Sequence, residues 1–157
     1  AAERPGAQRR DANASAAALA RAEAAWKKGS YKLARDEYIM AAKEDPLSYP
    51  AMLGLAKAWA KTDATPAGRQ RTLDCYKTAC SLRPSAVSTF LAAGELAAKL
   101  GQHATALELY SRAVAANPAD LSAIDGLIRA LRKVGGRKED ADAYQSYRDS
   151  LSQREAK

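Results

Sequence analysis

The chain has 157 residues, the length of a single domain. It is rich in alanine and poor in β-branched residues, which favours helices over strands. The formal net charge of +7 indicates an anionic partner, or serves only solubility. No apolar stretch approaches the roughly 18 residues of a membrane span, and no signal peptide is visible. We therefore expect no membrane span and a cytoplasmic location.

The first residues of the chain differ from the rest. Residues 1–12 (AAERPGAQRRDA) are polar and contain glycine and proline, which is typical of a flexible segment. We assign residues 1–14 to a flexible N-terminal tail and residues 15–157 to the folded domain.

The domain contains an internal repeat. An aromatic residue, an alanine and a proline recur at the same offsets three times: Tyr38, Ala41 and Pro46; Tyr76, Ala79 and Pro84; Tyr110, Ala113 and Pro118. Glycines near the middle of three units (Gly29, Gly101 and Gly135) indicate turns. These patterns divide the chain into units 15–48, 49–86, 87–120 and 121–157.

Each unit is predicted to contain two helices. An apolar periodic run is followed by a turn and a second run, and a proline then ends the second helix. One such pair cannot bury its apolar face alone, whereas a stack of pairs can. The second unit has four extra residues within 62–70, for which we predict a longer loop. In the last unit we predict a terminal helix with an apolar stripe of Ala143, Tyr144, Tyr147 and Leu151.

The residues that usually carry chemistry are few. His103 is the only histidine and follows a predicted turn, so we interpret it as a packing residue. Cys75 and Cys80 are five residues apart, which places them on different faces of a helix and predicts two unlinked thiols. No metal cluster, catalytic triad or phosphate-binding loop is visible. We therefore expect no enzymatic activity and no cofactor.

The repeat resembles the tetratricopeptide repeat, a helix–turn–helix unit of 34 residues. The third unit matches it best, through Ala93, Gly94, Ala97, Gly101, Ala106, Tyr110, Ala113 and Pro118. The resemblance covers residues 15–157 and implies an all-α, right-handed solenoid of stacked antiparallel helix pairs. It also implies a non-catalytic scaffold for protein–protein interaction, with the first helix of each unit lining a concave surface.

That placement predicts a ligand groove in which three sets of residues recur once per unit. The sets are Ala20, Gly54, Ala92 and Gly126; Glu23, Lys57, Glu95 and Arg129; and Lys27, Lys61, Lys99 and Lys133. The small residues leave room for a ligand backbone. The lysines either complement the helix dipoles or, together with Arg132, favour an acidic or extended peptide.

Two alternatives stay open. Five basic residues between Arg129 and Lys138, and an outer patch of Arg69, Arg71, Lys77 and Arg83, would suit nucleic acid or another anionic surface. A structural subunit of a large assembly is the other alternative. Binding of chaperone C-terminal tails is disfavoured, because the positions of the family's carboxylate clamp hold residues such as Leu19, Gly54 and Ala92.

Overall fold

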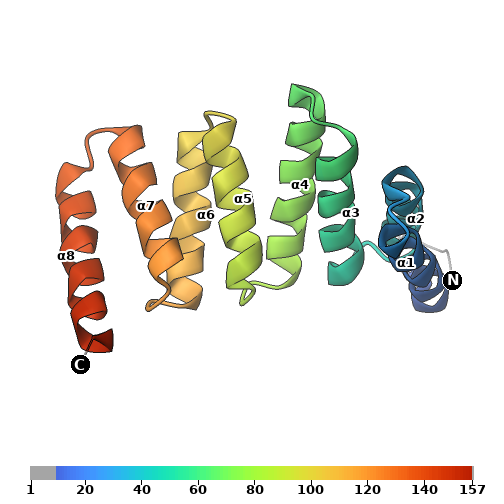
Figure 1. Cartoon of the computed structure of the whole chain (residues 1–157), viewed down its shortest axis with the longest axis horizontal. Helices are drawn as coiled ribbons and strands as arrows, with labels where there is room; N and C mark the ends of the chain where they lie inside the picture. Colours follow the sequence, from blue (N-terminus) through green and yellow to red (C-terminus); the bar gives the residue numbers. More distant parts are fainter. Residues whose placement is uncertain (1–9, 157) are drawn as a thin grey trace, which may run out of the picture.

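The computed structural model describes residues 10–156, and the part that it describes contains eight helices and no strand. The helices are α1 (Ala12–Lys27), α2 (Tyr31–Glu44), α3 (Tyr49–Thr62), α4 (Pro66–Leu82), α5 (Val87–Lys99), α6 (His103–Ala116), α7 (Leu121–Val134) and α8 (Lys138–Glu155). They form four antiparallel pairs that follow one another along the long axis of the molecule (Figure 1). The predicted all-α, right-handed solenoid is confirmed.

The start of the folded part is earlier than expected. Helix α1 begins at Ala12, inside the segment assigned to the tail, because the Asp11 carboxylate accepts a hydrogen bond from the Ala14 amide. The Asp11 amide donates in turn to the Glu44 carbonyl at the end of α2. The rest of the predicted flexible tail, residues 1–9, lies outside the described residues.

The helix ends follow from capping residues. Side-chain oxygens of Ser48, Thr65 and Asp120 accept from backbone amides in the first turns of α3, α4 and α7. The turn after α5 needs a positive φ, which Gly101 supplies at 74°. These local signals account for the starts of α3, α4 and α7 and for the turn after α5.

The predicted long loop in the second unit is absent. Three residues (63–65) join α3 to α4, as three residues join α1 to α2 and α5 to α6. Relative to the third unit, the extra residues lengthen α3 from 13 to 14 and α4 from 14 to 17 residues. Pro66 stands at the first position of α4, where its missing N–H costs nothing, so this proline starts a helix and does not mark a loop.

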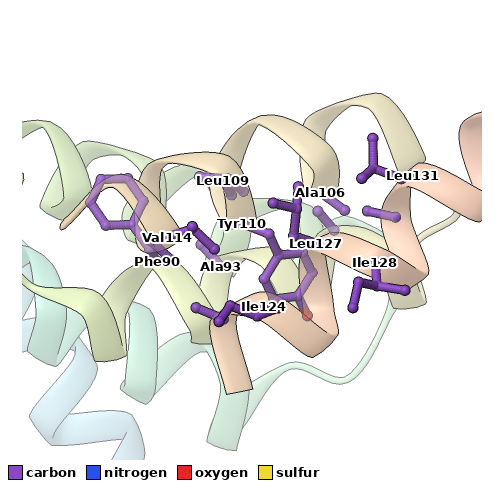
Figure 2. Close-up of a cluster of buried hydrophobic side chains, with 14 of the residues drawn as sticks. Phe90, Ala93, Ala106, Leu109, Tyr110, Val114, Ile124, Leu127, Ile128 and Leu131 are labelled. Carbon is purple, nitrogen blue, oxygen red and sulfur yellow. The ribbon is translucent and has the colours of Figure 1, made fainter. Parts of the chain in front are cut away.

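Alanine and tyrosine side chains account for the close packing within and between pairs. Ala34 and Ala106 have no exposed surface and stand at the fourth position of their helices, where two helices cross. Thr72 is the seventh residue of α4 and, like Ala34 and Ala106, stands four residues before the repeat tyrosine; its hydroxyl donates to the Gly68 carbonyl at 2.9 Å. The larger of two hydrophobic clusters runs from α4 to α8, and Figure 2 shows its centre around Tyr110.

The predicted apolar stripe of the last helix is partly wrong. Ala141 is buried and Ala143 is exposed, because α8 keeps the alanine at its fourth position as α2 and α6 do. The eleventh position of α2 and α6 is alanine, and α8 has Arg148 there. Its guanidinium pairs with Asp125 of α7 at 2.9 Å. An ion pair therefore joins α7 and α8 at the position where an alanine packs in the first and third helix pairs.

Candidate binding groove

The junctions between units are built from a tyrosine and a small residue. Tyr38 of α2 packs on Gly54 of α3, and Tyr110 of α6 packs on Gly126 of α7. A Cβ placed on either glycine would lie 2.2 Å from the nearest ring carbon. Burial raises the pKa of Tyr38, and the nearby Glu23 carboxylate raises it further. The small residues thus make room first for a tyrosine of the preceding unit.

The junction between the second and third units has an alanine in place of the glycine of the other two junctions. The tyrosine is Tyr76, and Ala92 stands where the other junctions have glycine. Tyr38 and Tyr110 are buried, whereas Tyr76 is only partly buried. A methyl group at this position would collide with a ring placed as in the other two junctions, which accounts for the greater exposure of Tyr76.

A pocket opens at each junction, between two first helices and the second helix that separates them. The 1/2 pocket has a volume of about 290 Å³ and is lined by Glu23, Trp26, Tyr38, Tyr49, Pro50, Leu53, Gly54, Lys57 and Arg83. The 2/3 pocket is the largest, at about 640 Å³, and is lined by Ala60, Asp63, Ala64, Arg69, Thr72, Tyr76, Ala92, Glu95, Leu96 and Lys99. The 3/4 pocket, of about 370 Å³, is lined by Glu95, Ala98, Lys99, His103, Ala106, Tyr110, Gly126, Arg129, Ala130 and Lys133.

Positive charge gathers in the 3/4 pocket. Lys99, Arg129 and Lys133 line it with a single carboxylate, Glu95, which pairs with Lys99 at 3.0 Å. In the 2/3 pocket two cations face two carboxylates. Of the three junction pockets, the 3/4 pocket therefore has the largest excess of cationic over anionic side chains.

Most residues of the three predicted sets line one of these pockets, but three do not. Nine of the twelve line at least one of the three pockets: Glu23, Gly54, Lys57, Ala92, Glu95, Lys99, Gly126, Arg129 and Lys133. Ala20 of α1 is exposed and lines none of them. Lys61 lies over the ring of Tyr31, with its Nζ 5.6 Å from the ring centre. Lys27 lies in the last turn of α1, where its charge complements the helix dipole.

The residues expected to form an outer basic patch are dispersed. Arg69 lines the 2/3 pocket and Arg83 lines the 1/2 pocket. Arg71 stacks on Trp59, with 5.0 Å between guanidinium carbon and ring centre, and lies 3.9 Å from the Asp63 carboxylate. Arg35 lies 4.6 Å from the centre of the same ring, so Trp59 contacts two cations from neighbouring units. Sequence reasoning missed these stacks.

The remaining candidate residues are structural. Cys80 is buried and Cys75 is half-buried, and the two thiols are unlinked as predicted. Burial raises the pKa of each thiol to about 11. Within residues 10–156 no group of three histidine, cysteine or acidic side chains is arranged to hold a metal ion. In the same range, no helix combines the length and the apolar character needed to cross a bilayer.

Solved structures with this fold are tetratricopeptide-repeat proteins. The crystal structure of MamA superposes with a TM-score of 0.72 at 20% identity, over 93% of this chain and 82% of that chain. YrrB, described as a TPR protein with an unusual peptide-binding site, gives 0.71 at 19%, over 90% and 69%. The first TPR of Spaghetti (RPAP3), bound to the HSP90 peptide SRMEEVD, gives 0.65 at 18%, over 83% and 100%. At these identities the likeness establishes the fold.

At the level of sequence, one family model matches the chain. No curated protein matches the chain. Residues 64–154, more than half of the chain, match the family model described as the bacterial transcriptional activator domain. The chain therefore belongs to the bacterial transcriptional activator domain family, with a TPR-like solenoid as its fold.

Proposed function

We propose that this chain is a non-catalytic interaction module that binds an extended, acidic segment of a partner protein along its first-helix face. The observation that carries the proposal is the run of three pockets at successive repeat junctions, each bounded by two first helices. An extended peptide can place side chains into neighbouring pockets while its backbone follows the groove.

The two larger pockets suit different side chains. The 2/3 pocket offers Tyr76, Leu96 and alanine methyl groups, and its charges balance, so it suits an apolar side chain. The 3/4 pocket offers Lys99, Arg129 and Lys133, so it suits one or two carboxylates. Glu95 and Lys99 line both pockets, which makes the two sites adjacent. We therefore propose a ligand with an apolar residue close to acidic residues.

Similar structures support a peptide as the ligand, and the matching family suggests a role in transcription. Two structures with this fold are described as peptide-bound or peptide-binding. The family description suggests that the partner acts in bacterial transcriptional regulation. The clamp positions for chaperone tails hold Leu19, Gly54 and Ala92, so we propose a partner other than such a tail.

The test is a selection of displayed random peptides, each of 12 residues, on the wild-type chain. We expect the selected peptides to combine an apolar residue with aspartate or glutamate. A fluorescein-labelled copy of the best peptide is then titrated with the triple variant Lys99→Glu, Arg129→Glu, Lys133→Glu. Each exposed pair contributes about 0.2–1 kcal/mol, so reversing three together should weaken binding at least tenfold.

The matched control reverses three exposed cations on second helices, Lys77→Glu, Arg112→Glu and Arg154→Glu. It changes the net charge equally and should leave peptide affinity within about twofold. Equal loss in both variants would contradict a groove site. Selected peptides without acidic residues would contradict the proposed ligand. Tight binding of a duplex DNA probe that collapses steeply with salt would instead favour nucleic acid.

A further inference from the structure

Helix α2 carries an exposed apolar stripe that the solenoid does not use. Leu33, Met40 and Leu47 recur every seven residues and are 55%, 45% and 56% exposed, and Ile39 beside them is 38% exposed. None of the four belongs to either hydrophobic cluster. Leu33 and Met40 lie on one side of α2, because seven residues are close to two helical turns, and Leu47 lies in the turn that follows the helix.

The second and third units have no such apolar residues at the equivalent positions. The equivalent residues are Arg71, Lys77, Thr78 and Ser85 in the second unit, and Thr105, Ser111, Arg112 and Ala119 in the third. The same solenoid position is therefore polar or small in both units. Packing between pairs does not require large apolar side chains there, so the first unit carries them for a contact outside the solenoid.

Charged residues on the same side of α2 indicate what makes this contact. Asp36 and Lys43 flank Ile39 and Met40, and both are exposed, although the Asp36 carboxylate also lies 3.5 Å from the Arg35 guanidinium. Glu37 is already occupied by Arg21 of α1, 2.8 Å away. If two α2 helices lie antiparallel about a two-fold axis between residues 39 and 40, each Asp36 lies opposite Lys43 of the other copy. Ile39 then meets Met40 across the axis.

We propose that the α2 stripe binds the same stripe of a second copy of this chain, in an antiparallel, two-fold arrangement. The pattern is self-complementary in charge, as such an interface requires. Residues 1–9 (AAERPGAQR) have no apolar side chain larger than those of alanine and proline, so they are poorly suited to cover leucine and methionine. Helix α2 has 14 residues and is about 21 Å long. The contact therefore buries less than a standard interface, and the dimer is a weak one.

The test is sedimentation velocity from about 10 µM to about 1 mM, the range in which small interfaces associate. We expect a monomer–dimer equilibrium for the wild type. Met40→Glu should weaken association at least tenfold. Ser111→Glu, which introduces the same charge at the α6 position equivalent to Ile39, should not. Circular dichroism of each variant reports whether the helices are intact.

A charge exchange then tests the geometry. Asp36→Lys alone and Lys43→Asp alone should each weaken self-association about fivefold or more, because each places like charges opposite one another twice. The double variant should restore it, and a mixture of the two single variants should form heterodimers. A wild-type chain that stays monomeric throughout, or a double variant that is not rescued, would overturn the proposal. Peptide binding in the groove should be unchanged in all of these variants, so the two proposals can fail separately.

Discussion

At the scale of single residues, one methyl group separates two kinds of junction. Gly54 and Gly126 let a tyrosine ring lie where a Cβ would be, and Ala92 does not. The ladder of small residues was predicted to admit a ligand backbone. The structure gives its two glycines a packing role first, with the largest pocket at the junction that has alanine.

This predicts the effect of Gly126→Ala. Alanine is the better helix former by about 1 kcal/mol, but its methyl group would lie 2.2 Å from the Tyr110 ring. Overpacking of this kind costs about 1–3 kcal/mol or more, so we expect a net loss of stability. Denaturant unfolding measures it, with Ser122→Ala on the exposed side of α7 as the control for helix propensity. A variant as stable as the control would show that the tyrosine can move away at no cost.

A second prediction concerns the start of the fold. The Arg10 guanidinium donates two hydrogen bonds to Asp45, at 2.8 and 3.1 Å, and this lowers the pKa of that carboxyl. A lowered folded-state pKa stabilises the protein above the unfolded-state value of about 3.9, and this contribution disappears as the pH falls through the folded-state value. Asp45→Asn should therefore lower the melting temperature at pH 7 and have little effect near pH 2. A difference that persists at low pH would mean that the pair does not act through its charge.

At the scale of helices, periodicity predicted the elements well and their ends less well. The repeated tyrosine, alanine and proline located four pairs, because these residues report the close helix crossings. The Pro–Ala–Gly sequence at 66–68 was misread as a loop. Helix α4 starts here because Thr65 caps its first turn. The Asp63 carboxylate in turn holds Thr65 in place by accepting a hydrogen bond from its amide at 3.0 Å. These capping contacts do not recur at the second helices of the other units, so the repeat pattern could not predict where α4 begins.

The N-terminal turn of α4 is therefore predicted to depend on its cap. Thr65→Ala removes the hydroxyl that accepts from the Gly68 amide at 3.1 Å, which should cost about 1 kcal/mol. We expect faster hydrogen exchange at the Gly68 and Arg69 amides, with the end of the helix near Leu82 unaffected. Thr78→Ala, exposed in the middle of α4, is the control. Unchanged exchange in the Thr65 variant would mean that packing alone holds this turn.

At the scale of the whole molecule, the repeat register predicted three sets of groove residues, and nine of these twelve residues line the junction pockets. It could not predict that Lys61 stacks on Tyr31, because that contact joins different units and depends on side-chain reach. For the same reason the register could not show that, among the junction pockets, cations outnumber carboxylates most in the 3/4 pocket. The identity of the partner is not encoded in the repeat, since the same solenoid carries many ligands.

The central claim is that a partner segment binds on the first-helix face across the second, third and fourth units. Amide chemical-shift mapping tests it most directly, with the selected acidic peptide titrated into the isotope-labelled wild-type chain. We predict that the largest shifts cluster on α5 and α7, at Glu95, Lys99, Gly126, Arg129 and Lys133, with α2 unaffected. Shifts confined to α2, or to the exposed sides of α4 and α6, would contradict the account and place the binding site outside the groove.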